Sequence, residues 1–311
     1  MKILVTGGAG FIGSLLVDRL IKRGDEVVVV DNLSTGKKVN LNERAKLYLL
    51  NICAFDELNK VFEIEKPEFV LHLAANSLLR KSIDDPMYDV KCNVLGTISV
   101  LECCRKNNVR KIIYTSTGGA RVGEPEYLPV DEKHPLNPSS PYGISKHSAE
   151  HYVWMYGQLY NLDYLIFCFG NVYGPRDDPI TKRLGPLFMH MILNDQTPKI
   201  FGDGEQTRDF IYVLDLVDFI VESMNKSPEH KLFHLANGKE VSVNEFFRIL
   251  KEVTGFERDA EKIDAIKGEV RDIVLDISLA QKELGWKPQT DLRSGLSETW
   301  VWFKENNCRE Y

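Results

Sequence analysis

The sequence lacks the cysteine patterns that disulfide frameworks and zinc sites require. Its six cysteines include no CxxC pair and no Cys/His spacing of the zinc type: Cys53, Cys92, Cys103, Cys104, Cys168 and Cys308. Neither a disulfide framework nor a metal site is therefore expected. Reduced thiols in the cytoplasm are the simplest interpretation.

An excess of basic residues and a long apolar run are also missing. The chain has 39 Lys and Arg against 45 Asp and Glu, a net charge of -6. This balance gives no global electrostatic reason to bind nucleic acid or anionic membranes. No apolar run approaches the roughly 18 residues of a membrane span, and the turn at Gly7 follows Met1 too closely for a signal peptide. We expect a cytoplasmic protein with neither kind of partner.

What the first half of the chain does contain is an alternation of short apolar runs and helical patterns. Strands are expected at residues 3–5, 27–30, 47–50, 69–73, 112–115 and 164–169, and helices at 14–23, 55–63, 94–106 and 146–160. Such alternation predicts an α/β fold, a Rossmann-type doubly wound parallel sheet. Beyond about residue 170 the alternation weakens and Gly/Pro pairs increase, which indicates a smaller C-terminal α/β lobe.

A glycine-rich turn follows the first expected strand. It reads Thr-Gly-Gly-Ala-Gly-Phe-Ile-Gly over residues 6–13, with GxxGxxG spacing at Gly7, Gly10 and Gly13. Such a turn lets the backbone approach a pyrophosphate at a helix N-terminus. Asp31 ends the next strand, where its carboxylate would bind the adenosine ribose and repel a 2′-phosphate, so NAD is favoured over NADP. A purely structural turn and a solvated Asp31 are the alternatives.

A tyrosine and a lysine with four-residue spacing follow the fifth expected strand. Tyr142 and Lys146 form the only YxxxK in the chain, and residues four apart share one helical face. A nearby ammonium lowers a phenol pKa, so Tyr142 would act as a general base. Thr117 lies at the end of the fifth strand, where its hydroxyl would relay a proton. A chance match and an ordinary strand-end hydroxyl are the alternatives.

These motifs, taken together, resemble a known family. The further stretches are Asp31 to Gly36 (DNLSTG), His72 to Ala75 (HLAA), Ser140 to Lys146 (SPYGISK), Asn171 to Arg176 (NVYGPR), Gly202 to Val213 (GDGEQTRDFIYV), and Gly268 to Asp272 with Asp276. The ordered series is similar to the extended short-chain dehydrogenase/reductases and, within them, to the NAD-dependent epimerase/dehydratase family. The resemblance covers nearly the whole chain.

The resemblance implies a role for each matching residue. The catalytic residues would be Thr117, Tyr142 and Lys146. The cofactor would be NAD, tightly bound and recycled, held by Tyr142 and Lys146 and by Gly7, Gly10, Phe11, Ile12, Gly13, Asp31, Asn32, Ser34, Thr35, Gly36, Asn51, Ile52, Leu73, Ala74 and Ala75. The UDP-sugar substrate would contact Thr117, Asn171, Phe201, Arg208 and Arg271. The two arginines would clamp the diphosphate, unless they form surface ion pairs with the neighbouring Asp209 or Asp272.

The resemblance also implies how the chain divides and assembles. The NAD-binding Rossmann domain would comprise residues 1–170 and about 208–240. The nucleotide-sugar-binding lobe would comprise residues 171–207 and 241–311. Relatives commonly form homodimers through the helices that correspond to residues 94–106 and 146–160, so we expect a homodimer.

Five residues depart from the family pattern. Asn51 stands where an aspartate is usual. The sixth strand carries Cys168-Phe169 where an Arg-Tyr pair is common, which leaves the contacts of that pair in doubt. Val122 replaces a tyrosine, a change expected to enlarge the substrate pocket. The helix expected after Ala75 carries Asn76 where relatives often have glutamine.

The function implied is that of an isomerase, an NAD-dependent nucleotide-sugar 4-epimerase. It would interconvert UDP-glucose and UDP-galactose through a transient 4-keto intermediate. UDP-N-acetylglucosamine or UDP-glucuronate 4-epimerisation and UDP-glucuronate decarboxylation remain open. A 4,6-dehydratase is disfavoured, because Gly118-Gly119 stand where such relatives carry an Asp-Glu pair. A catalytically silent NAD-binding sensor or scaffold on the same fold is the alternative of another class.

Overall fold

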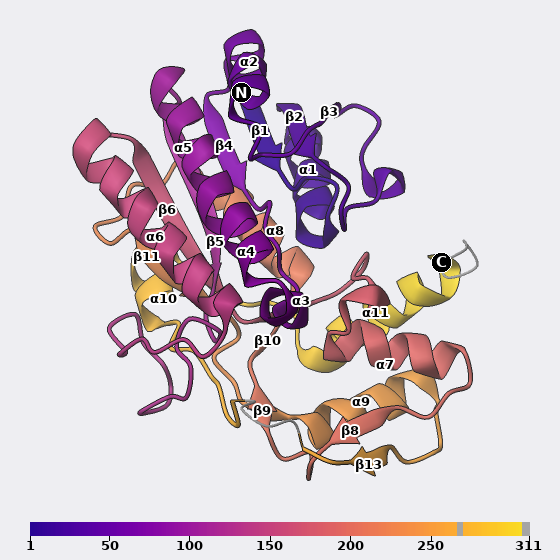
Figure 1. The fold of residues 1–311 in the computed structure, drawn as a ribbon. Helices are drawn as coiled ribbons and strands as arrows, with labels where there is room; N and C mark the ends of the chain where they lie inside the picture. Colours follow the sequence, from indigo (N-terminus) through magenta and orange to yellow (C-terminus); the bar gives the residue numbers. More distant parts are fainter. Residues whose placement is uncertain (266–269, 307–311) are drawn as a thin grey trace. The chain divides into compact units, whose positions relative to one another are not determined.

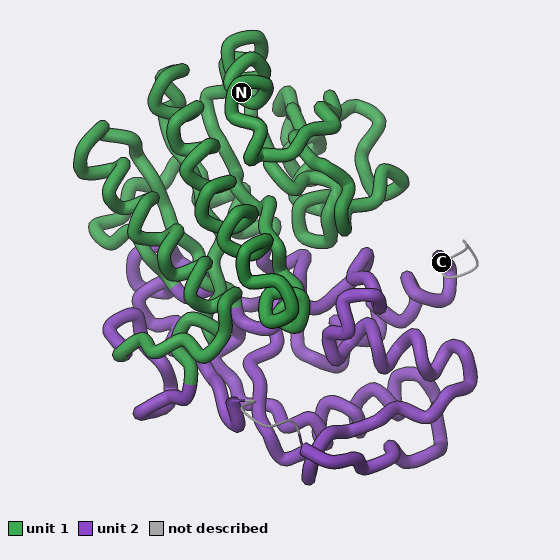
Figure 2. The backbone as a smooth tube through the Cα atoms, in the orientation of Figure 1, with its two compact units in different colours: residues 1–123, 135–169, 217–233 green, residues 124–134, 170–216, 234–311 purple. Residues whose placement is uncertain are grey.

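The chain forms two compact units. The computed structural model describes residues 1–265 and 270–306. The first unit comprises residues 1–123, 135–169 and 217–233, and the second comprises residues 124–134, 170–216 and 234–311 (Figure 2). Residues 124–134, 208–216 and 234–240, which the expected bounds place in the Rossmann domain, lie in the second unit. Part of the reason is that Val130 exchanges backbone hydrogen bonds with Val274 and Asp276, a long-range pairing without a local sequence signal.

A seven-stranded sheet forms the centre of the first unit (Figure 1). Its strand order is β11-β6-β5-β4-β1-β2-β3. The strands are β1 (Lys2–Thr6), β2 (Glu26–Asp31), β3 (Lys46–Leu49), β4 (Phe69–His72), β5 (Lys111–Thr117), β6 (Asp163–Phe169) and β11 (Leu232–Leu235). The pairings of β1 through β6 are parallel. Because central parallel strands are buried on both faces, they read as continuous apolar runs such as Val27 to Val30.

Helices cover both faces of this sheet. On one face Val28 and Val30 share a core with α2 (Phe55–Glu65), α5 (Gly96–Lys106) and α6 (Pro141–Tyr160). On the other face Val29 and Val17 of α1 (Phe11–Arg23) both lie next to Gly8. The helix α8 (Val213–Ser223) is tied to α1 by an ion pair of Arg19 with Asp218, 2.7 Å. The predicted doubly wound Rossmann-type sheet is thus confirmed.

The helix boundaries correct the sequence-based expectations at three places. The first helix begins at Phe11 and not at residue 14. The expected helix at 146–160 begins at Pro141, because Ser140 caps it by accepting a hydrogen bond from Gly143 N, 3.1 Å. After Ala75 the chain continues as a loop, and α3 spans Leu79–Asp84. A π-helical turn at Lys91–Leu95, which no pattern predicted, joins α4 (Pro86–Val90) to α5.

The second unit has a separate core beneath three two-stranded sheets. β7 (Asn171–Tyr173) pairs with β10 (Phe210–Tyr212), β8 (Lys199–Phe201) with β13 (Glu261–Ile263), and β9 (Thr207–Arg208) with β12 (Val241–Ser242). Its helices are a short one at Pro179–Thr181, α7 (Leu184–Leu193), α9 (Val243–Thr254), α10 (Ser278–Leu284) and α11 (Leu292–Asn306). Another short helix, at Lys38–Asn40, belongs to the first unit. Strands thus lie between helices, as expected for a smaller α/β lobe.

Within the part of the chain that the structure describes, no helix combines the length and hydropathy that a membrane span needs.

Candidate active site

The glycine turn lies between the end of β1 and the start of α1, and its backbone geometry explains its composition. Gly7 has a φ of +71°, and a Cβ there would lie 2.7 Å from Ala74 N. A Cβ on Gly13 would lie 2.1 Å from Gly7 O. Side chains at either position would therefore collide with backbone, and only glycine lets the three segments come this close. Gly10 precedes the helix without a side-chain cap, which suits an anion at the helix N-terminus.

Asp31 holds the glycine turn from the end of β2. Its carboxylate accepts hydrogen bonds from Ala9 N at 2.9 Å and from Leu33 N at 2.8 Å. A backbone hydrogen bond also joins the turn to the segment after β2, from Lys37 N to Ala9 O at 2.9 Å. A carboxylate has about four lone-pair sites, so Asp31 retains acceptor capacity for two ribose hydroxyls. The residues present therefore fit the adenosine end of NAD.

Most of the remaining predicted cofactor residues are at least partly exposed, and Ile52 is an exception. Asn32, Ser34 and Thr35 are exposed, and Gly36 lies against Ala9. Leu73, Ala74 and Ala75 directly follow β4 and are partly exposed, as are Phe11 and Ile12 at the start of α1. Asn51 is exposed, but the side chain of Ile52 is buried in the core. A cofactor contact at Ile52 would therefore come from its backbone.

A buried hydrogen-bond chain fixes the ends of β1 and β4 around the turn. Thr97 donates to Asn93 O, 2.7 Å, so its oxygen accepts from His72 Nε2, 2.9 Å. His72 Nδ1 then accepts from the Thr6 hydroxyl at 2.6 Å, and Thr6 in turn accepts from Ala74 N at 3.2 Å. Burial lowers the pKa of His72 to about 3, so the ring stays neutral in this tautomer. Sequence reasoning quoted His72 only as part of a motif and missed this role.

Lys146 lies in the first turns of α6, buried against β5. Its ammonium donates to Thr115 O at 2.6 Å and lies 4.2 Å from the centre of the Tyr114 ring. Burial lowers the pKa of Lys146 to about 8, although the charges of Glu150 and Asp89 act to raise it. A cation that is only just retained at neutral pH can polarise neighbouring groups strongly, which is typical of catalytic lysines.

Tyr142 lies on α6, as Lys146 does, and Thr117 lies on β5, as Thr115 does. Tyr142 is the second residue of α6, one turn before Lys146, and its backbone N donates to Ser82 Oγ, 3.2 Å. Thr117 ends β5, is partly exposed, and accepts from Ala120 N, 3.3 Å. The structure thus places the three predicted catalytic residues at the N-terminus of α6 and the carboxyl end of β5, which pack together.

A buried ion pair lies beside Cys168 of β6. Arg121 donates to Glu150 Oε2 and to Cys168 Sγ, both at 3.1 Å. Glu150 also accepts from Ser116 Oγ and lies 3.0 Å from His147 Nδ1. A guanidinium from the loop after β5 therefore lies against Cys168, the position at which the family pattern predicted an arginine. Its neighbour Val122 is fully buried, and the expected enlargement of the substrate pocket stays a prediction.

The predicted substrate residues belong to the second unit, apart from Thr117, and most lie near one another. Arg208 Nη1 donates to Thr207 O and to Arg271 O, at 2.7 and 2.9 Å. Asn171 N donates to Asp209 O, 2.6 Å. Phe201 ends β8, where its carbonyl accepts from Gln206 Nε2, 3.0 Å. The structure brings the backbones that carry Asn171, Arg208 and Arg271 into neighbouring positions.

The two arginines differ in their ionic contacts. Asp209 is buried, and its carboxylate accepts hydrogen bonds from three backbone N–H groups, those of Asn237, Gly238 and Leu275. Arg271, in contrast, forms an exposed ion pair with Asp203 at 3.1 Å and lies 3.9 Å from Asp272. Among the described residues no ion pair joins Arg208 to Asp209, whereas Arg271 forms one chiefly with Asp203, a partner that sequence reasoning had not considered.

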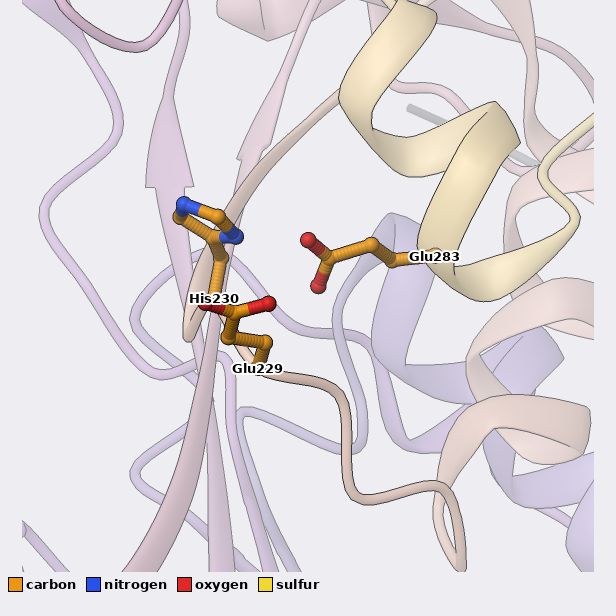
Figure 3. Close-up of side chains that lie close together, drawn as sticks. All are labelled: Glu229, His230 and Glu283. Carbon is orange, nitrogen blue, oxygen red and sulfur yellow. The ribbon is translucent and has the colours of Figure 1, made fainter.

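Three potential metal ligands are distributed over both units. Glu229 and His230 lie just before β11, whereas Glu283 lies on α10 (Figure 3). Glu229 and His230 are exposed, and exposed acidic groups commonly occur without an ion. We assign no metal site to these residues.

Comparison with known proteins assigns the site to a family. The family model "NAD dependent epimerase/dehydratase family" matches residues 3–236. The chain belongs to the NAD-dependent epimerase/dehydratase family. It is 46% identical to a putative UDP-glucose 4-epimerase of Methanocaldococcus jannaschii, over 98% of this chain and 99% of that protein. It is 38% identical to a UDP-glucose 4-epimerase of Mycolicibacterium smegmatis, over 99% of this chain and 100% of that protein.

A solved structure gives the same result. The crystal structure of the Thermotoga maritima UDP-glucose 4-epimerase with UDP-glucose matches at a TM-score of 0.96 and 40% identity, covering 99% of this chain and 100% of that one. The predictions of a Rossmann-type fold, of NAD as cofactor and of an enzyme of the epimerase class are thereby confirmed for this family member. The roles of individual site residues remain predictions.

Proposed function

We propose that this chain is a UDP-glucose 4-epimerase, which interconverts UDP-glucose and UDP-galactose. The observation that carries the proposal is the buried Lys146 ammonium on Thr115 O, one helical turn from Tyr142 and beside the end of β5. A tyrosine and a lysine so arranged are suited to moving a proton on and off a sugar hydroxyl. High identity to named UDP-glucose 4-epimerases over the whole chain supports the choice of substrate.

In this proposal Tyr142 removes the proton of the sugar 4-hydroxyl. The Lys146 cation stabilises the phenolate form of Tyr142, and Thr117 passes the proton between sugar and tyrosine. NAD, held by the glycine turn and Asp31, supplies the reversible acceptance of a hydride from C4. After the 4-keto sugar has turned over, Tyr142 returns the proton to the product. The cofactor is regenerated in each turnover and has no need to leave.

The second unit would hold the nucleotide. Arg208 and Arg271 carry guanidinium groups on adjacent backbone segments, and such groups make paired, charge-assisted hydrogen bonds to a diphosphate. Asn171 would add a hydrogen bond there, and Phe201 would contact the base. When the diphosphate is bound tightly, the sugar can still rotate and present either face to the cofactor. We accordingly propose that the first unit binds NAD and the second binds the nucleotide sugar, in the cytoplasm.

The substrate assignment is tested by product analysis. Purified protein without added NAD is incubated separately with UDP-glucose, UDP-N-acetylglucosamine and UDP-glucuronate, and the products are separated and identified. We expect UDP-galactose from the first substrate as the fastest conversion. Faster conversion of an N-acetylated or uronic sugar would overturn the choice of substrate, and consumption of added NAD in proportion to product would overturn the recycling scheme.

The role of Tyr142 is tested separately. Tyr142→Phe removes the phenolic oxygen and keeps the ring, so NAD binding is expected to persist while turnover is lost. Tyr160→Phe, which alters an exposed tyrosine near the other end of α6, is the matched control and is expected to keep both. Epimerisation by the Tyr142→Phe protein would reject the proposed base.

We also propose a homodimer, formed through the outer faces of α5 and α6. These helices pack together, and large apolar side chains on and next to them are exposed: Leu95, Trp154 and Leu159. An exposed apolar surface of this kind is typical of a protein–protein interface.

A further inference from the structure

A buried carboxylate lies beside the first turn of α6. Asp89, on α4, is completely inaccessible to solvent. Its Oδ1 accepts hydrogen bonds from Asn76 Nδ2 at 2.8 Å and Asn93 Nδ2 at 3.1 Å, and its Oδ2 accepts from Ser145 Oγ at 2.5 Å. Within residues 1–265 and 270–306 it forms no ion pair. We call Asn76, Asp89, Asn93 and Ser145 the Asp89 cluster.

The backbone of Asn76 determines the orientation of the Asn93 amide. Asn93 Oδ1 accepts from Asn76 N at 2.8 Å, and Asn93 Nδ2 donates to Asn76 O at 3.1 Å. This two-point contact turns Nδ2 toward Asp89, so Asn93 approaches the carboxylate as a donor. Asp89 therefore accepts hydrogen bonds from two amides and one hydroxyl.

Ser145 connects this carboxylate to the proposed catalytic helix. It lies between Tyr142 and Lys146 in α6, and its hydroxyl contacts Asp89, Asn93 Nδ2 at 3.0 Å and Tyr142 O at 3.1 Å. Asn93 lies in the π-helical turn, and such turns are frequent at functional sites. The cluster therefore ties α4 and the π-helical turn to the residues around Tyr142.

We propose that Asp89 is a positioning residue for Tyr142 and Lys146. Its buried carboxylate holds the first turn of α6 through Ser145 and adds a negative charge to the surroundings of that turn. The inference rests on the proposed roles of Tyr142 and Lys146. It names Asp89 as the residue that fixes the position of the helical turn between them.

Several groups around Lys146 act on its charge, and Asp89 is one of them. From β5 the lysine meets Thr115 O and the Tyr114 ring, and His72 on β4 is neutral. Two carboxylates and the thiol of Cys168 on β6 act to raise its pKa. One carboxylate, Glu150 on α6, is paired with Arg121 and contacts His147, which offsets its charge. The hydrogen-bond partners of Asp89, in contrast, are uncharged side chains: Asn76, Asn93 and Ser145. No cation among them offsets the charge of Asp89.

The test is the pH dependence of epimerisation in the Asp89→Asn holoenzyme. Activity that needs the ammonium falls as the pH rises through the pKa of Lys146. Removing the Asp89 charge lowers that pKa, so the alkaline limb of kcat is expected to move to lower pH. Asp89→Glu keeps the charge and is expected to keep the position of the limb. The same fractional loss of kcat at every pH would overturn the electrostatic role.

Two further variants separate charge from geometry. Ser145→Ala keeps the carboxylate but cuts its link to α6, so kcat is expected to fall at least tenfold with the alkaline limb unmoved; a wild-type kcat would overturn the positioning role even where Asp89→Asn fails to fold. Glu102→Gln removes a carboxylate that contacts Tyr156 on α6 and is expected to leave the limb in place. If Tyr142→Phe retained activity, the proposed function itself would fail, independently of these results.

Discussion

The ion pair of Arg271 with Asp203 competes with the role proposed for Arg271. Both side chains are more than half exposed, so solvent screens the pair and it stabilises the free protein little. A diphosphate must displace Asp203 before the guanidinium can bind it. Asp203→Asn removes this competition, and we predict that the KM for UDP-glucose falls up to about fivefold with kcat unchanged.

Steady-state kinetics at low ionic strength checks this prediction, since screening weakens both contacts. Asp259→Asn is the matched control, because it removes an exposed carboxylate that pairs with Lys251 and is expected to leave KM unchanged. A higher KM in Asp203→Asn would show that Asp203 helps to orient Arg271 for the substrate.

The buried charge of Lys146 lowers the free energy of unfolding. Burial lowers its pKa from 10.5 to about 8, which corresponds to a cost of roughly 3 kcal/mol below pH 8, where both the folded and the unfolded chain carry the proton. Between pH 8 and 10.5 the folded chain loses the proton first, so the cost decreases. We predict that Lys146→Met, although inactive, raises the free energy of unfolding by about 1–3 kcal/mol at pH 7, and by less at pH 10.

Urea unfolding at both pH values measures this difference. Lys60→Met, at an exposed position on α2, is expected to change stability little at either pH. A destabilised Lys146→Met protein at pH 7 would mean that the bond to Thr115 O outweighs the cost of burial.

The residues that sequence reasoning found and those it missed differ in how far their partners lie along the chain. Gly7 to Gly13, Tyr142 and Lys146 form short patterns whose spacing reflects one turn or one helix. The partners of Asp89 are Asn76, Asn93 and Ser145, and Arg121 meets Cys168 across 47 positions. Buried polar contacts of this kind leave no local pattern, because each partner alone is an ordinary polar residue.

At the scale of secondary structure, the central strands were predicted because burial on both faces makes them continuously apolar. Their ends shifted by only one or two residues in most cases, as between the expected 164–169 and the observed Asp163–Phe169. Helix starts were less predictable, since Ser140 and Pro141 determine the start of α6 through capping, ahead of its apolar pattern. The strand pairing around Val130 depends on tertiary contacts and has no period to detect.

The pairing of Arg121 with Glu150 joins the loop after β5 to α6, and Cys168 on β6 completes it. Arg121→Val would leave Glu150 buried without its guanidinium, which typically costs about 3–5 kcal/mol. Cys168→Arg in that background returns a guanidinium from β6 to the side of Glu150. We predict that the double variant regains at least half of the lost free energy of unfolding.

A double-mutant cycle measured by urea unfolding checks this coupling. Cys168→Arg alone is expected to destabilise the protein, because it places a second cation beside Arg121. The same substitution is thus expected to be harmful in one background and restoring in the other. Additive effects of the two substitutions would mean that Arg121 does not stand in for an arginine on the sixth strand.

At the scale of the whole molecule, α6 carries two surfaces with different tasks. Lys146 lies on its buried side, and Trp154, on the same helix, is 53% exposed. Solvation of so large an apolar side chain is unfavourable, and a second copy of the chain would remove it from water. We predict that the wild-type protein is a dimer in solution and that Trp154→Glu makes it a monomer.

Light scattering coupled to size-exclusion chromatography distinguishes the two states. Leu49→Glu is the matched control, because it places the same charge at an exposed apolar position on the edge strand β3 and is expected to leave the dimer intact. A wild-type monomer at micromolar concentration would reject the interface. In the Trp154→Glu monomer, α6 lacks the second copy of the chain that packs against it. Because α6 also carries Tyr142 and Lys146, we expect this variant to have a lower kcat and a lower melting temperature. Leu49→Glu is expected to leave kcat unchanged.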